Sequence, residues 1–128
     1  MDKSSTIADM VFAVELANLQ ELSMKMTVYR TVLGGADFHA ADIPDEHQCR
    51  LGQLYDNMLA QETIKPSAVY KKIDQPHRAV HQQAKDALNH YHKAEWPNVL
   101  RCLNHMEQAN LQVMALMQQL LADISRDI

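Results

Sequence analysis

Two histidines with the spacing of metal ligands on a helix are the first candidates for chemistry. His77 and His81 are four residues apart in the segment PHRAVHQQAKDAL, and the same helical face continues through Ala84, Leu88 and Tyr91. Because that face is apolar, both imidazoles are expected to point toward the core, where an unpartnered histidine is costly. A shared zinc ion would satisfy both rings. The alternative is two partly exposed histidines that hydrogen-bond to neighbours, since such pairs often arise by chance.

Cys49 is a third candidate ligand, provided that its helix brings it beside the two histidines. It lies in the segment CRLGQLY, and the apolar side chains around it are equally consistent with an inert buried cysteine. Gly52, three residues later, costs a helix about 1 kcal/mol unless another element packs closely there. That cost suggests a close approach between helices beside Cys49.

Glu21 is the fourth residue of interest, because it interrupts an apolar helical stripe. This stripe is apolar at both ends and polar in the middle, at Asn18, Glu21 and Lys25. A carboxylate in such a position needs a partner. Lys25, four residues later, would supply an ordinary helix ion pair, whereas a carboxylate oxygen can also join nitrogen and sulfur as a zinc ligand.

Further cysteine and histidine residues are interpreted as structural. Cys102 and His105 have ligand spacing in the last predicted helix, but we interpret them as a packed cysteine and a surface histidine. His90 and His92 are two residues apart, point to different faces of a helix and are expected to be solvated.

The spacing of apolar residues predicts helices that would position these side chains. They cover about 6–33, 46–60, 75–93 and 97–125, and no segment alternates cleanly enough to predict a strand. Long amphipathic helices with short connections favour an antiparallel four-helix bundle, here with a short Cys-bearing second helix. The sequence therefore predicts an all-α fold that forms a single domain over residues 1–128.

Local signals mark the ends of these helices. Thr6 and Asp9 resemble a capping box at the start of the first helix, and glycine at Gly34 is expected to end it. Asp74 is placed to cap the third main helix. Pro97 marks the start of the last, because proline loses no hydrogen bond in the first turn.

The composition excludes several classes of protein. The chain has 128 residues, 47% apolar and 22% charged, with a net charge of -4, which argues against disorder and against nucleic-acid binding. No apolar segment reaches the ~20 residues needed to cross a bilayer, and the N-terminal segment does not resemble a signal peptide. Two cysteines cannot build a disulfide framework. We therefore expect a cytoplasmic protein that binds neither nucleic acid nor membrane.

The order of these motifs resembles the chemoreceptor zinc-binding (CZB) domain. In that family a first-helix histidine, a cysteine with glycine three residues later and an H-x-x-x-H helix hold one zinc ion inside a four-helix bundle. The corresponding segments here are Cys49-Arg50-Leu51-Gly52-Gln53-Leu54-Tyr55 and His77-Arg78-Ala79-Val80-His81. The resemblance spans about residues 21–120 and implies zinc as the cofactor.

The first motif departs from the family pattern. Its alignment places Glu21 where the family has histidine, and Met24 where the family has tryptophan. Glu21 would then be an oxygen ligand beside the cysteine and the two histidines, in a weaker and more pH-sensitive site. The alternatives are a three-ligand site completed by water, a loop histidine (His39 or His47) as the fourth ligand, or loss of metal binding.

The resemblance implies a regulatory function, with zinc held by Glu21, Cys49, His77 and His81. Family members usually sit beside an output module of bacterial signal transduction, as in chemotaxis. This chain leaves no room for such a module, so we expect a free-standing sensory domain that acts on a signalling protein. It would sense zinc, or oxidation of the Cys-zinc site, and signal through helix repacking.

The alternative function is a metal-free helical adaptor or dimerisation domain that has lost the zinc site. Its stability would be indifferent to chelators. A homodimer fits both functions, because bundles of this size often pair through an exposed apolar face. An enzyme with Glu21 as general base is not expected, because no glycine-rich loop or second acid–base pair accompanies the site.

Overall fold

The computed structural model describes residues 3–46, 48 and 68–126, and all regular structure within them is helical. The long helices are α1 (Lys3–Val32), α4 (Asp74–His92) and α5 (Trp96–Arg126), accompanied by the short η1 (Ala40–Asp42) and α3 (Ala68–Lys72). The all-α fold class is therefore confirmed. The predicted helix over 46–60, which carries Cys49, lies almost entirely outside the described residues, so the four-helix bundle stays a prediction.

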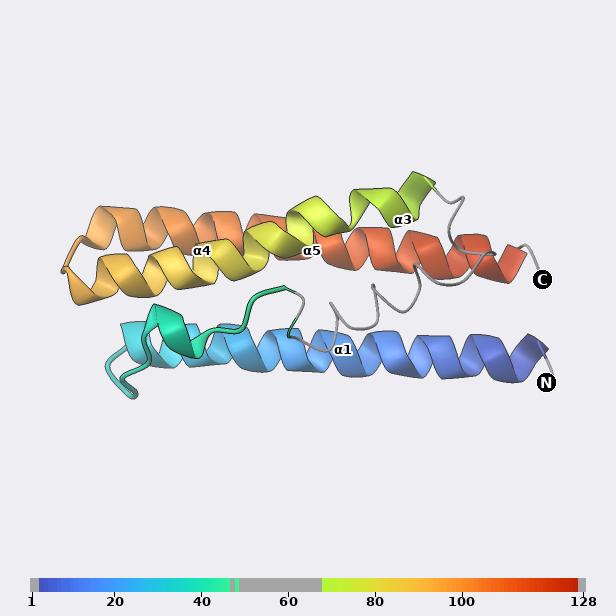
Figure 1. Ribbon diagram of the computed structural model, residues 1–128, viewed down its shortest axis with the longest axis horizontal. Coiled ribbons are helices and arrows are strands. Elements are labelled where there is room, and N and C mark those ends of the chain that lie inside the picture. Colours follow the sequence, from blue (N-terminus) through green and yellow to red (C-terminus); the bar gives the residue numbers. More distant parts are fainter. Residues whose placement is uncertain (1–2, 47, 49–67, 127–128) are drawn as a thin grey trace.

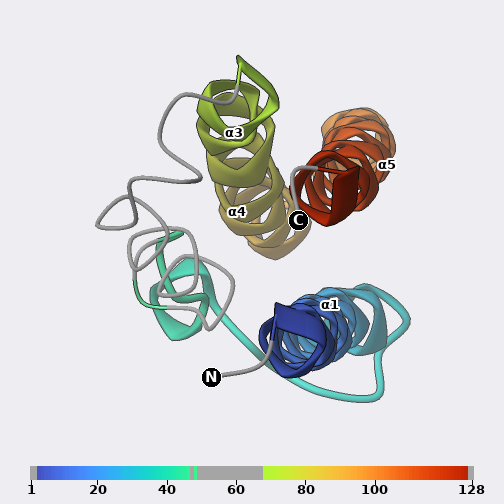
Figure 2. The same ribbon diagram turned by 90° about the vertical axis from the view of Figure 1, so that its right-hand side faces the viewer.

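The three long helices lie side by side along one axis (Figure 1). α4 and α5 form an antiparallel hairpin, and α1 runs antiparallel to α5. The view down the axis in Figure 2 shows the three helices grouped around a common centre. In the described part of the chain, no helix combines the length and the apolar character needed to span a membrane.

The core consists of the facing sides of these helices. α5 buries the apolar residues that recur along it at helical spacing, Val99, Leu103, Met106, Val113, Met117 and Leu120. The predicted inner face of α4 is confirmed, since His77, His81, Ala84 and Leu88 are buried. Burial of these two faces against each other explains why the hairpin forms from regular apolar spacing alone.

α1 buries the stripe with the polar centre rather than its most apolar stripe. Val14, Ala17 and Val28 are buried together with Glu21 and Lys25. Larger apolar residues along the helix and at its end remain exposed, namely Phe12, Leu19, Leu22, Met26 and Leu33. The stripe that contains Glu21 therefore faces the other helices.

α1 and α4 end in the same way. After α1, Gly34 adopts a left-handed φ of 89°, its N–H donates to Thr31 at 3.0 Å, and the N–H of Gly35 donates to Arg30 at 2.8 Å. These two bonds form a Schellman motif, which satisfies the last carbonyls of the helix. The motif recurs after α4, where Ala94 takes the left-handed position with a φ of 56°. The predicted role of glycine at the end of α1 is therefore confirmed.

The predicted caps at two helix starts are wrong. α1 begins at Lys3, so Thr6 lies inside the helix, because no proline or glycine in the preceding residues interrupts helical backbone. α4 begins at Asp74 itself, and its N-cap position is occupied by Ile73 without a side-chain cap. The Asp74 carboxylate instead accepts a hydrogen bond from Arg78, one turn later.

Candidate metal centre

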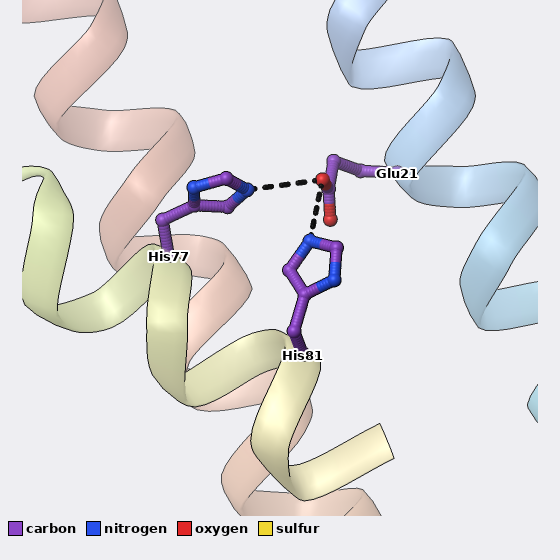
Figure 3. Close-up of side chains that lie close together, drawn as sticks. All are labelled: Glu21, His77 and His81. Carbon is purple, nitrogen blue, oxygen red and sulfur yellow. Dashed lines mark hydrogen bonds and ion pairs between the residues drawn. The ribbon is translucent and has the colours of Figure 1, made fainter. Parts of the chain in front are cut away.

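Two histidines and one glutamate meet in the core between α1 and α4 (Figure 3). α4 presents His77 and His81 one turn apart, and α1 presents Glu21 opposite them. Nε2 of His77 lies 3.1 Å from Oε1 of Glu21, and Nε2 of His81 lies 3.0 Å from the same oxygen. All three side chains are buried: His77 is 3% exposed, His81 1% and Glu21 4%. The structure thus brings together three of the four predicted ligands.

His81 is held from both sides. Its Nδ1 lies 2.7 Å from the carbonyl oxygen of Pro44, while Nε2 faces Glu21. Carbonyl and carboxylate oxygens only accept hydrogen bonds, so both ring nitrogens donate when both contacts are made, and His81 is then an imidazolium. Burial opposes that charge, but the hydrogen bond and charge of Glu21, with help from Pro44 and Glu46, raise the pKa of His81 above 6.5.

The same geometry suits a metal ion. One donor atom each from Glu21, His77 and His81 lies within 4.8 Å of the others. Two ligands of a tetrahedral zinc ion with bonds of about 2.1 Å are roughly 3.4 Å apart, so the observed separations of 3.0 and 3.1 Å need only small shifts. Two imidazoles and a carboxylate are a common zinc set. The Nδ1–H of His81 keeps its carbonyl partner in such a site, the arrangement that orients most metal-bound histidines.

Cys49, the predicted sulfur ligand, lies outside the described residues. The described chain that precedes it is held beside the site. Pro44 contacts His81, and the carboxylate of Glu46 lies 3.2 Å from Nε of Arg78 on α4. The segment before Cys49 therefore reaches the helix that carries the two histidines.

His39 is not part of this centre, so its predicted alternative role as the fourth ligand is wrong. It lies in a separate group with Asp37 and His92. His92 ends α4, eleven residues beyond His81 and therefore about 16 Å farther along the helix axis. The segment after α1 carries His39 to that distant end. His47, the other loop histidine, lies outside the described residues.

Lys25 forms its ion pair with Glu107 on α5 and not with Glu21, the partner that the sequence offered as an alternative. Its Nζ lies 2.9 Å from the carboxylate of Glu107 on α5, and the Tyr29 hydroxyl donates to that carboxylate at 3.0 Å. Burial, followed by the hydrogen bond and charge of Glu107, raises the pKa of Tyr29 to about 12. Lys25 and Tyr29 therefore fasten α1 to α5, while Glu21 faces the histidines.

Cys102 and His105 of α5 show the burial that the sequence predicts for them. Cys102 is buried and His105 is exposed, which confirms their interpretation as a packed and a surface residue. Burial raises the pKa of the Cys102 thiol, and the negative charge of Asp86 raises it further. The positive charge of Arg101 acts in the opposite direction but does not cancel them. A thiol of raised pKa is a poor nucleophile and a poor ligand at neutral pH.

Two groups around the site were not foreseen from the sequence. The carbonyl of Pro44 acts through the backbone, so its residue type carries no signal for this role. Glu107 is 82 residues from Lys25, and nothing in its local sequence links the two.

A scan against protein-family models matches the chemoreceptor zinc-binding domain over residues 22–88, just over half of the chain. This chain belongs to the CZB domain family. The match includes Cys49, His77 and His81 and begins one residue after Glu21. The family is a zinc-binding, regulatory family of signalling proteins. Zinc is therefore the cofactor, and the buried group of Glu21, His77 and His81 offers donor atoms of the kinds that zinc binds. Searches of the curated proteins and of the solved structures found no match.

Proposed function

We propose that this CZB domain holds one zinc ion with Glu21, Cys49, His77 and His81 and thereby regulates a bacterial signalling protein. The observation that carries this proposal is the convergence of two buried imidazoles and a buried carboxylate, from two helices, on one point. When bound, zinc supplies the positive charge that links these donors and keeps a cysteine ligand in the thiolate form.

The residues of the centre change their bonding between two states. Without metal, His81 carries a proton on Nε2 and pairs with Glu21. In the loaded state this proton leaves, while Nδ1–H keeps its bond to Pro44. The charge and spacing of the contact between α1 and α4 differ between the states, which is the basis for a signal through helix repacking.

α1 is the element on which this change acts. The middle of its buried face is polar, with Glu21 directed at α4 and Lys25 at Glu107 of α5. A helix held by such contacts depends on charge as well as on apolar burial. A change of charge at the centre is therefore transmitted to the position of α1.

Cys49 gives the domain a second input. A cysteine thiolate attacks one oxygen of hydrogen peroxide, the O–O bond breaks, and hydroxide leaves with the bonding electron pair, so that the sulfur becomes a sulfenic acid. The oxidised sulfur is a poorer ligand than the thiolate. Oxidation therefore loosens the same centre that zinc closes, in the cytoplasm where thiols are kept reduced.

Metal content and thermal melting of the untagged protein test this function. We expect one zinc ion per chain by mass spectrometry and a melting temperature that falls on chelation. Cys49→Ala and His81→Ala should abolish stoichiometric zinc, whereas Cys102→Ala, the matched cysteine control, should retain it. No zinc uptake together with an unchanged melt would contradict the proposal and identify a metal-free adaptor.

We further propose that α1 pairs with α1 of a second copy of the chain. The exposed apolar residues form one stripe with intervals of three, four and seven residues, namely Phe12, Leu19, Leu22, Met26 and Leu33. Exposed Glu15 lies in the first half of this stripe, and exposed Arg30 borders the second half. In an antiparallel pair about a two-fold axis, each acidic half meets a basic half, so charge complementarity favours this partner.

Light scattering after gel filtration tests the pairing. We expect a dimer for the unaltered chain and a monomer for Leu19→Glu, because the pair would bury two uncompensated charges. Ala115→Glu is a suitable control, since Ala115 is exposed on α5 and shares a different surface with Lys72 and Gln75. A monomeric unaltered chain, or a dimer that tolerates Leu19→Glu, would contradict the proposal.

A further inference from the structure

A second group of metal-ligating side chains lies on the surface, at the far end of α4 from the buried centre. Asp37 and His39 belong to the segment between α1 and η1, and His92 is the last residue of α4. One donor atom of each lies within 4.8 Å of the other two. All three residues are exposed, so an ion can reach them directly from water.

The distances within this group are close to those of a metal site. Oδ1 of Asp37 lies 3.6 Å from Nε2 of His39 and 3.9 Å from Nε2 of His92. Two ligands of a tetrahedral ion with bonds of about 2.1 Å are roughly 3.4 Å apart. Nε2 of His92 also lies 2.9 Å from the carbonyl oxygen of Phe38, to which it donates as N–H. Uptake of an ion replaces this proton, as it does at any histidine ligand.

The backbone brings these groups together before any ion binds. The rings of His39 and His92 stack in parallel, with centroids 3.9 Å apart and planes 2° apart, so one ring has to turn out of the stack before both Nε2 lone pairs face the same ion. The backbone N–H of His39 donates to the carboxylate of Asp42 at 2.9 Å, which fixes the segment that carries the ring. Such ordering lowers the entropy that binding must remove. In addition, His92 lies at the C-terminal end of α4, where the helix dipole favours a cation.

We propose that Asp37, His39 and His92 form a second, solvent-exposed binding site for a divalent transition-metal ion such as zinc. Two imidazoles with one carboxylate select such ions over magnesium and calcium, which prefer oxygen ligands alone. Water fills the remaining coordination positions, so the site binds more weakly and exchanges faster than a closed four-ligand centre. An ion there ties the segment after α1 to the end of α4. The exposed site therefore fills at higher zinc concentrations than the buried centre, and the domain responds to zinc over a wider range of concentration.

Calorimetric titration of the full chain, preloaded with one equivalent of zinc, tests this site. We expect one additional, weaker binding event, accompanied by shifts of the His39 and His92 ring signals in NMR spectra. His39→Ala and His92→Ala should each weaken this event by at least about tenfold. His105→Ala, an exposed histidine outside the group, is the matched control and should leave it unchanged. Magnesium at the same concentration should give no signal.

Three results would overturn the proposal: no second event, its survival in both cluster variants, or an equal loss in His105→Ala. All three substitutions are on the surface, so an unchanged melt verifies that each variant is folded. Failure of the buried centre is recognised separately. In that case the chain takes up a single ion, which His92→Ala loses and His81→Ala retains.

Discussion

Replacement of Glu107 by glutamine tests how firmly α1 is held beside the metal centre. The Glu107 carboxylate accepts hydrogen bonds from Lys25 and from Tyr29, at 2.9 and 3.0 Å. Glutamine keeps the shape of the side chain and one acceptor oxygen but removes the negative charge. The buried ammonium of Lys25 then loses the charge of its partner on α5.

The expected loss of stability follows from the burial of the two side chains. Removal of one partner costs about 3–5 kcal/mol in a fully buried ion pair and about 0–1 kcal/mol in an exposed one. The Lys25 side chain is 10% exposed and that of Glu107 is 39% exposed, so the pair lies between these limits. We expect a cost of about 2 kcal/mol. For 128 residues and an unfolding entropy of about 2.1 cal/mol/K per residue, the melting temperature falls by about 7 °C.

Tyr29 provides a second readout for the same substitution. Burial and Glu107 raise the pKa of its hydroxyl from 10.0 to about 12. Because the folded pKa lies above the unfolded one, this contribution to stability is present below pH 10 and is lost as pH rises through about 12. In Glu107→Gln the pKa of Tyr29 should fall toward its ordinary value, and the loss of stability at alkaline pH should become smaller. Absorbance titration of the phenolate measures the shift.

A double-mutant cycle separates the ion pair from other effects. Lys25→Met and Glu107→Gln should be non-additive by about 1 kcal/mol or more, because each alone removes the same contact. Lys71→Met removes an exposed charge of α3 and serves as the control. An unchanged melt and an unchanged Tyr29 titration in Glu107→Gln would refute the reasoning that this carboxylate fastens α1 to α5.

Three further predictions concern single positions. Ala94→Gly should stabilise the chain by about 1 kcal/mol, because φ is 56° there and glycine adopts left-handed backbone without strain; a lower melting temperature would contradict this. Glu21→His should tighten zinc binding in a competition titration with a chelating dye, and unchanged affinity would remove Glu21 from the ligand set. Zinc affinity should fall as pH is lowered, because a proton competes for Nε2 of His81, whose pKa is raised above its ordinary value; a flat profile would exclude His81 as a ligand.

The sequence predicts the α4–α5 hairpin well because its apolar residues recur at one helical period. Val99, Met106 and Val113 recur at this period along α5, and they are buried. α1 is different, because it carries two apolar stripes. The one with the larger residues, such as Leu19, is exposed, whereas the one that contains Glu21 is buried. Periodicity identifies a helix, but it does not decide between two faces of similar hydrophobicity.

The neighbouring helices decide which face of α1 turns inward. The buried face is the one whose polar residues find partners, with Glu21 at the histidines and Lys25 at Glu107. Burial of a charged side chain is tolerated only where such a partner compensates it. Those partners lie more than fifty residues away in the chain, so no local pattern could reveal them.

At the candidate metal centre, too, one part follows from the sequence and another only from the tertiary structure. Helix geometry alone places His77 and His81 side by side, because residues four apart share one face, and the sequence therefore determined this pair. Only the tertiary structure decided that Glu21 meets both rings and that Pro44 holds the outer nitrogen of His81. The reason is physical: spacing within a helix is set by its repeating backbone hydrogen bonds, whereas contacts between segments are set by packing of the whole chain.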